Sequence, residues 1–235
     1  AMFTLELSPL AGLHDALWMP LYNALFKSHE ALYVRIEALA SSSATTRLVK
    51  HLPECDKKTH VRVVFISDTH QKMRHIRVPH GEILCVCGDL LLRNGFWYGA
   101  KGALSEVDRV LKSLPHKHKI VIAGNHDKLI EDSGPDLARV LLRSCIYLQN
   151  SSVTVMGLKF YGCPYSPLSP SRNSAFQYMR KEAADLLARV PRDTDVLLTH
   201  SRDKFTAAAA RMASPLVHAV GHFHAEHGCG WDNGT

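Results

Sequence analysis

The chain has 235 residues, of which 46% are hydrophobic and 21% are charged. This balance is that of an ordinary globular protein, and it excludes a disordered, collagenous or coiled-coil chain. Lysine and arginine number 28 against 22 acidic residues, and the resulting formal charge of +6 suits an anionic ligand without identifying one. The 15 histidines are more informative, because histidine is the commonest metal ligand and a frequent acid–base residue.

The N-terminal sixty residues differ from the rest in pattern. Leucine and isoleucine recur at helical spacing between charged residues, which predicts an amphipathic helix over residues 21–40. A serine- and threonine-rich stretch at 41–46 then interrupts the pattern. We expect residues 1–60 to form an N-terminal helical extension and linker, ahead of one domain over 61–235. The helix is expected to pack on the domain surface, with a membrane-surface or partner-binding helix as the alternatives.

Targeting signals and cysteines predict a cytoplasmic protein. The uncharged stretch 16–26 contains Pro20 and is far shorter than the ~18–20 apolar residues that span a bilayer, so no membrane span is expected. No secretory leader pattern is present at the start of the sequence. The six cysteines include no C-x-x-C pair, and Cys85 and Cys87 are expected to be buried free thiols on one face of a strand. Nothing in the sequence specifies an oligomeric state.

From residue 61 onward, short apolar runs alternate with helical patterns. The runs are rich in Val and Ile and end in Gly or a polar residue, as buried strands do; they lie at 61–67, 83–88, 119–124, 195–200 and 216–221. Helical spacing predicts helices near 104–114 and 179–190, and Gly157 marks a hairpin within 145–162. This alternation predicts a layered α/β domain. His116 and His118 flank a strand start and are expected in a solvated basic turn.

Metal-binding residue types follow or end every one of the five predicted strands. In chain order they are Asp68 and His70, Asp89, Asn125 with His126 and Asp127, His200, and His222 with His224. In an open α/β sheet the ligand site lies beyond the carboxyl ends of the strands, so these side chains should converge at one edge. Mixed carboxylate, amide and imidazole ligands favour Mn, Fe or Zn over Ca or Mg. So many ligand-type groups exceed the needs of one ion and predict a two-metal site.

The ordered blocks D-x-H, G-D, G-N-H-D, H and G-H-x-H resemble the calcineurin-like metallophosphoesterase superfamily. The segments 119–127, 146–167 and 216–230 are similar to its metallophosphoesterase-domain-containing (MPPED-type) family. The resemblance covers about residues 61–235. It implies a four-layer sandwich of two mixed β-sheets flanked by helices.

The resemblance also implies a role for each site residue. One divalent ion would be bound by Asp68, His70 and His224, the second by Asn125, His200 and His222, with Asp89 bridging the two. Manganese is the expected metal, with iron and zinc as alternatives. A hydroxide between the metals would attack phosphorus, with His126 as general acid and Asp127 orienting the site. Asn125, His126 and Tyr165 would contact substrate, Tyr165 by stacking on a base, although a structural role for this aromatic is the alternative.

The implied activity is hydrolysis of a small phosphodiester, with cyclic nucleotides as the expected class. A nuclease of the same superfamily and a non-catalytic scaffold of the same fold are the alternatives, and nucleic acid is the less expected partner. The sequence departs from the family at 200–203, where His-Ser-Arg-Asp replaces the usual His-Gly-Pro-Pro, so the substrate pocket is expected to be altered. Residues 228–235 are expected to form a strand entering a turn, after which the family has another strand, so either the sequence is truncated or the second sheet is one strand short.

Overall fold

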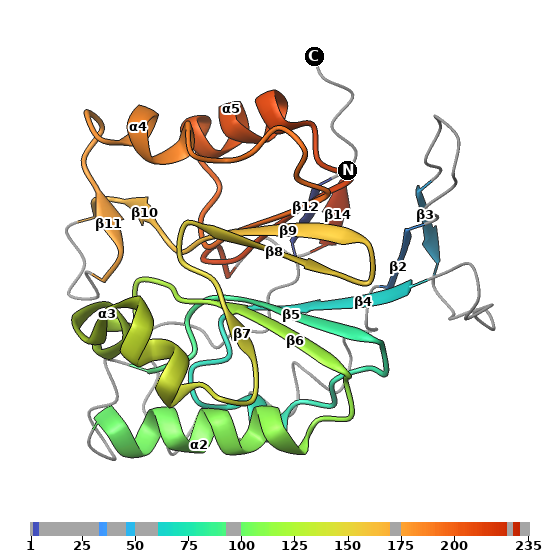
Figure 1. Ribbon diagram of the computed structural model, residues 1–235, viewed down its shortest axis with the longest axis vertical. Coiled ribbons are helices and arrows are strands. Elements are labelled where there is room, and N and C mark those ends of the chain that lie inside the picture. The colour runs from blue at the N-terminus through green and yellow to red at the C-terminus, as the bar shows by residue number, and fades with distance from the viewer. Residues whose placement is uncertain are drawn as a thin grey trace.

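The protein is a four-layer sandwich, in which two β-sheets pack face to face and helices cover both outer faces (Figure 1). The computed structural model describes residues 2–4, 33–36, 46–49, 61–92, 100–169, 175–224 and 228–230. Helices α2 and α3 lie on one side of the sandwich, and α4 and α5 lie on the other. The predicted layered α/β architecture is therefore confirmed.

The first sheet contains six strands in the order β3-β2-β4-β5-β6-β7. Strands β4 to β7 are parallel to one another, whereas β2 is antiparallel to both β3 and β4. Every residue of β5 is buried, as expected for a strand covered on both faces. The strands are β2 (Tyr33–Ile36), β3 (Thr46–Val49), β4 (Val61–Ile66), β5 (Ile83–Cys87), β6 (His118–Ile122) and β7 (Ile146–Tyr147).

The second sheet also contains six strands, in the order β14-β1-β13-β12-β9-β8. They are β1 (Met2–Thr4), β8 (Ser151–Val155), β9 (Leu158–Cys163), β12 (Val196–Thr199), β13 (Val217–Val220) and β14 (Gly228–Gly230). Strands β8 and β9 form the predicted hairpin. Its two-residue turn, Met156 and Gly157, has positive φ at both positions, as a type I′ turn requires. A separate pair of two-residue strands, β10 (Ser166–Pro167) and β11 (Gln177–Tyr178), is parallel.

Four α-helices and one 3-10 turn cover the sheets in the described residues. They are η1 (Met73–His75), α2 (Ala100–Ser113), α3 (Lys128–Leu141), α4 (Ala183–Leu187) and α5 (Lys204–Ala213). Helix α2 confirms the helical pattern near 104–114, whereas α4 is shorter than the predicted 179–190. Helix α3 was not predicted; it is kinked at Gly134, where φ is 72°, directly before Pro135. Helix α5 was not predicted either, and it begins at a capping box formed by Asp203 and Thr206.

Three clusters of buried apolar side chains lie between the layers. The central cluster joins the two sheets and includes Cys85 and Cys87, which are buried free thiols as predicted. A second cluster fills the space between the first sheet and helices α2 and α3. A third, smaller cluster packs β9 and β12 against α4 and α5. The packing of the layers fixes the position of the carboxyl ends of the strands in one sheet relative to those in the other.

Two sequence predictions are wrong where the structure describes them. Residues 33–36 form strand β2 and not part of a helix; the rest of the predicted helix 21–40 lies outside the described residues. Backbone pairing of β2 with β4 makes this segment a strand, although its leucine spacing predicts a helix. His116 is buried, not solvated, and its Nε2 lies 2.8 Å from the Pro79 carbonyl oxygen, whereas His118 is the half-buried first residue of β6. None of the helices among the described residues has the length and apolar character needed to cross a membrane.

Candidate metal centre

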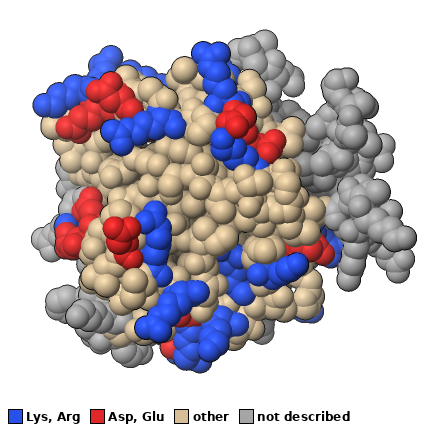
Figure 2. All heavy atoms as spheres, viewed as in Figure 1, with Lys and Arg blue, Asp and Glu red and all other residues tan. Residues whose placement is uncertain are grey.

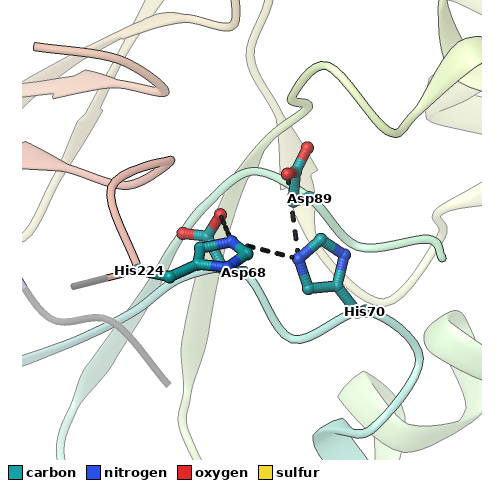
Figure 3. Close-up of side chains that lie close together, drawn as sticks. All are labelled: Asp68, His70, Asp89 and His224. Carbon is teal, nitrogen blue, oxygen red and sulfur yellow. Dashed lines mark hydrogen bonds and ion pairs between the residues drawn. The ribbon is translucent and has the colours of Figure 1, made fainter. Parts of the chain in front are cut away.

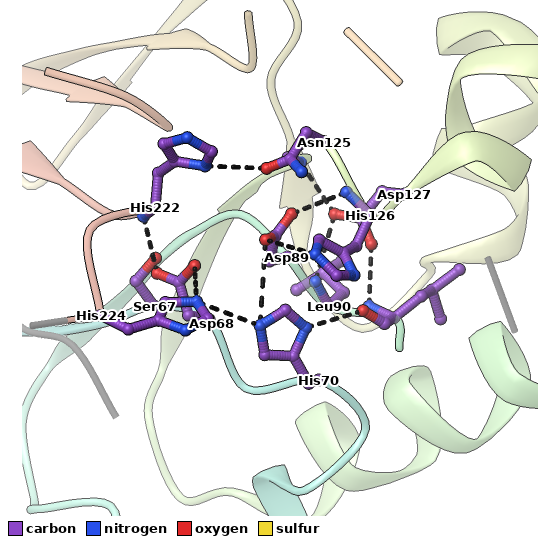
Figure 4. Close-up of polar contacts among 12 residues, drawn as sticks. Ser67, Asp68, His70, Asp89, Leu90, Asn125, His126, Asp127, His222 and His224 are labelled. Carbon is purple, nitrogen blue, oxygen red and sulfur yellow. Dashed lines mark hydrogen bonds and ion pairs between the residues drawn. The ribbon is translucent and has the colours of Figure 1, made fainter. Parts of the chain in front are cut away.

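Polar side chains from both sheets converge at one place in the molecule (Figure 4). Asp68 and His70 follow β4, Asp89 follows β5, and Asn125 follows β6, all in the first sheet. His200 follows β12, while His222 and His224 follow β13 in the second sheet. The structure thus brings together all seven residues that the sequence proposes as metal ligands. Their assignment as ligands stays a prediction, and it is developed below.

The first cluster contains Asp68, His70, Asp89 and His224 (Figure 3). One ligand atom from each lies within 4.8 Å of the others. His224 Nε2 is 3.3 Å from Asp68 Oδ1 and 3.4 Å from His70 Nε2, and His70 Nε2 is 3.9 Å from Asp89 Oδ2. The aspartates and His70 are buried, whereas the side chain of His224 is 28% exposed, so the cluster is open to solvent at His224.

The second cluster contains Asp89, His200 and His222. His200 Nε2 lies 3.3 Å from Asp89 Oδ1 and 2.9 Å from Asn125 Oδ1. The same amide oxygen lies 2.9 Å from His222 Nδ1. Two imidazoles, one carboxylate and one amide oxygen therefore face one point, as the predicted second metal site requires.

Asp89 belongs to both clusters, so its two carboxylate oxygens face the two sides of one centre. A bridging carboxylate is what a two-metal site needs. Asp68 Oδ1 is buried and lacks a well-aligned hydrogen bond, although His224 Nε2 lies 3.3 Å away, and a cation between the two atoms would satisfy it. The donors are imidazole nitrogens with carboxylate and amide oxygens, a set that suits a transition-metal dication. The described residues therefore fit a pair of divalent ions.

Backbone carbonyls fix the tautomers of two of the histidines. His70 Nδ1 donates to the Leu91 carbonyl oxygen at 3.1 Å, and His200 Nδ1 donates to the Cys87 carbonyl oxygen at 2.9 Å. Because a carbonyl oxygen only accepts hydrogen bonds, each Nδ1 carries a hydrogen, and each Nε2 is the nitrogen that can bind an ion once it is unprotonated. No sequence signal identifies these carbonyl partners, since they are set by the packing of β5 and the turn after it.

Glycines and strained backbone let the loops approach one another closely. A Cβ on Gly124 would lie 2.6 Å from both the Asp89 backbone nitrogen and His200 Cε1, so only glycine fits there. Among the described residues nine non-glycine residues have positive φ. Five of these carry or adjoin the centre: Asp68, His70, Gln71, Asp89 and His222. Such clustering of strained residues is characteristic of functional sites.

Burial and ion pairing set opposite protonation tendencies in the centre. Although burial opposes ionisation, the neighbouring His200 holds the pKa of Asp89 far below its ordinary value. Burial alone would lower the pKa of His200, but the charges of Asp89 and Asp68 raise it to about 10. Without a metal, a proton shared with these carboxylates therefore takes the place of positive charge that an ion would supply.

His126 and Asp127 follow Asn125 and lie beside the clusters. The His126 ring is 4.5 Å from the His70 ring, its Nε2 is 3.8 Å from Asp89 Oδ2, and its side chain is 16% exposed. Burial lowers the pKa of His126 to about 4. Asp127 is fully buried and accepts hydrogen bonds from the backbone N–H groups of Leu90, Leu91 and Gly124. Its described partners are thus backbone amides and not a histidine ring, so it orients the site by joining two loops.

Tyr165 was proposed from the sequence as a stacking residue for a base. Its ring packs edge-on against Phe176, with centroids 5.5 Å apart, and it contacts the two apolar clusters that lie beneath the helices. Burial raises the pKa of its hydroxyl, which hydrogen-bonds Gln149. These contacts suit the structural role that the sequence left as the alternative, and stacking of Tyr165 on a base stays a prediction.

Comparison with known proteins agrees with this geometry. A Caenorhabditis elegans UPF0046 protein is 30% identical over 204 residues, covering 75% of this chain and 68% of that protein. Human metallophosphoesterase domain-containing protein 1 is 28% identical over 218 residues, covering 75% of this chain and 64% of that protein. A probable rhamnogalacturonate lyase C from Emericella nidulans is 36% identical over 191 residues, but these are only 17% of its length.

A solved crystal structure shares the fold, with a TM-score of 0.52 at 14% identity over 72% of this chain and 84% of that one. The sequence model of the calcineurin-like phosphoesterase family matches residues 61–235, which contain every residue of both clusters. The chain therefore belongs to the calcineurin-like phosphoesterase family.

Proposed function

We propose that this protein is a metal-dependent phosphodiesterase that hydrolyses a small phosphodiester, with cyclic nucleotides as the expected substrate class. The observation that carries the proposal is that Asp89 joins two His-containing clusters into one centre. Family membership supports phosphoester hydrolysis, and the mixed nitrogen and oxygen donors favour manganese, with iron and zinc as alternatives.

In this proposal Asp68, His70 and His224 hold one ion, Asn125, His200 and His222 hold the second, and Asp89 contacts both. When bound, two such ions supply Lewis acidity toward the phosphoryl oxygens and lower the pKa of water. The carbonyl contacts of His70 and His200 keep both Nε2 atoms directed at the centre. The strained loops hold the ligands in place before any ion arrives, which reduces the reorganisation that binding requires.

His126 is proposed to give a proton to the leaving oxygen. Its ring lies beside Asp89 and is partly exposed, so a phosphoester at the centre can reach it. Burial keeps the imidazole neutral near pH 7 in the substrate-free protein, with a pKa of about 4. An anionic phosphoryl group beside the ring would raise this pKa, because an opposite charge favours the protonated form.

The charges on the face drawn in Figure 2 give no support to a nucleic-acid substrate. On the face that Figure 2 shows, Lys and Arg side chains lie beside Asp and Glu side chains, and the centre of this face carries neither. No continuous basic stripe crosses the part of this face that the structure describes. Long nucleic acids are instead bound through extended basic surfaces.

The test measures hydrolysis of bis-p-nitrophenyl phosphate by the purified chain with added Mn²⁺. The Asp89→Asn variant should abolish turnover, since it removes the charge shared by both clusters. Asp136→Asn is the matched control, because Asp136 is a fully solvated surface residue on α3. Undiminished turnover in Asp89→Asn would refute the two-metal proposal, and a wild-type chain without metal-dependent turnover would favour a non-catalytic scaffold. Turnover of 3′,5′- and 2′,3′-cyclic nucleotides then tests the substrate class.

A further inference from the structure

Phe223 is an exposed aromatic residue inserted between the two last histidines of the centre. Its side chain is 37% exposed. Among the described residues, the other exposed large hydrophobic side chains are aliphatic or methionine, and none of them lies between two centre residues: Leu137, Val140, Met156, Leu168, Met179 and Met212. An exposed ring at this position is not explained by packing of the core.

The backbone on both sides of Phe223 is held by the centre. Its own N–H donates to the Gly221 carbonyl oxygen at 3.0 Å, and the His222 N–H donates to Asp68 Oδ2 at 2.9 Å. On the other side, His224 Nε2 contacts Asp68 Oδ1 at 3.3 Å. The backbone before the ring and the side chain after it are therefore held by the centre, which limits where the ring can lie when a ligand contacts it.

The ring also lies directly against the centre. Its centroid is 5.1 Å from that of the His222 ring, and the two planes are inclined at 79°. His222 in turn contacts Asn125 Oδ1 within the second cluster. A group attached to a phosphoryl oxygen at the centre is therefore within reach of an exposed, preoriented π-face.

We infer that Phe223 is a specificity-determining residue that stacks on a planar aromatic group of the substrate, such as a nucleobase. This inference rests on the proposed function, and it adds a preference for phosphoesters that carry an aromatic group over those that do not. Stacking of a base on an aromatic side chain contributes about 1–3 kcal/mol, which corresponds to about 5- to 150-fold in affinity. Tyr165, whose ring is packed among structural aromatics, is not needed for this contact.

The test is isothermal titration calorimetry on the full chain supplemented with Mn²⁺, using adenosine 5′-monophosphate and ribose 5-phosphate as probes. Both probes carry the same phosphate ester, but only the first carries a base. Wild type should bind adenosine 5′-monophosphate more tightly, by about 5-fold or more. Phe223→Ala and Phe223→Leu should reduce this ratio toward one, whereas Phe223→Trp should retain it. The leucine variant keeps apolar bulk, so it separates stacking from general hydrophobic contact.

Equal affinity of wild type for both probes would overturn the inference, as would an unchanged ratio in Phe223→Leu. Thermal unfolding of each variant establishes that the fold is intact before its ratio is interpreted. Failure of the proposed function gives a different result. In that case wild type shows no metal-dependent hydrolysis of bis-p-nitrophenyl phosphate, while the preference between the two probes is still measured by binding alone.

Discussion

Asp127 offers a direct test of how the loops of the centre are held together. Its Oδ2 accepts from the N–H groups of Leu90 at 3.1 Å and Gly124 at 2.8 Å, and its Oδ1 accepts from Leu91 N–H at 2.8 Å. The carboxylate is fully buried. Removing it leaves three buried donors without acceptors, and each such donor costs about 1–3 kcal/mol. Asp127→Ala should therefore lower the free energy of unfolding by about 3–9 kcal/mol.

Asp127→Asn should have a smaller effect. Its amide oxygen can still accept from Leu90 and Gly124, while its NH₂ group would face the Leu91 N–H and leave one donor unsatisfied. The expected loss is about 1–3 kcal/mol. Urea unfolding followed by circular dichroism measures both variants in EDTA. It should be done at pH 8, because burial and the charge of Asp89 raise the pKa of Asp127 to about 7.

The control is Asp136→Ala, which removes an exposed carboxylate and should change stability by less than about 0.5 kcal/mol. Equal losses in Asp127→Asn and Asp127→Ala would refute the reasoning, because they would show that the number of amide partners does not matter. A loss below about 1 kcal/mol in Asp127→Ala would refute it as well.

Three further predictions follow from the centre and from the strand behind it. Gly124→Ala should abolish Mn²⁺ binding in calorimetry, because the new methyl would lie 2.6 Å from His200 Cε1; Gly157→Ala, in an open hairpin turn, should retain binding. Mn²⁺ binding at pH 7 should release about one proton from His200, because the charge of Asp89 outweighs the effect of burial and raises the pKa of His200 to about 10. Calorimetry in buffers of different ionisation enthalpy measures this release. Binding without proton release would contradict the ion pair between His200 and Asp89. Burial lowers the pKa of His218 from 6.5 to about 4, so the unfolded state binds the proton more readily and about 3 kcal/mol of stability is lost as the pH falls from 6.5 to 4. The loss in the metal-free chain should be correspondingly smaller in His218→Gln, and identical pH profiles would contradict the assignment.

The sequence predicts those parts of the molecule that local patterns determine. Five strands after residue 60 were predicted to within two residues, because an apolar run that ends in a polar block is a local signal. The two-residue strands β7, β10 and β11 are too short to give such a signal. The convergence of Asp68 and Asp89 followed from the rule that the parallel strands of one sheet deliver their carboxyl ends to one edge. His200 comes from the second sheet, and the packing of that sheet against the first lies outside this rule. Strand β2 could not be predicted in this way, since its pairing with β4 is a long-range contact that leucine spacing does not reveal.

Backbone partners were equally invisible in the sequence. Asp127 was expected to orient the site as carboxylates orient histidines, but its partners are the amides of Leu90, Leu91 and Gly124. His116 was expected in solvent, but it is buried with its Nε2 beside the Pro79 carbonyl oxygen, 37 positions away in the chain. Helix α3 was missed because Gly134 and Pro135 stand within it, and both residues ordinarily argue against a continuous helix. In each case the structure depends on a long-range contact or on a local backbone kink, and a periodic pattern in the sequence reveals neither.

The division of the centre between two sheets has a consequence for how the protein acquires its ions. Each cluster takes residues from the first sheet and residues from the second, and contacts such as that between Asp68 and His222 span 154 positions in the chain. During folding, neither cluster is complete until β13 has docked beside β12. An ion that binds earlier meets only part of its coordination shell and exchanges rapidly. Slow metal release would therefore identify molecules in which the two sheets have packed together. The bound ions would stabilise that packing and slow the separation of the sheets.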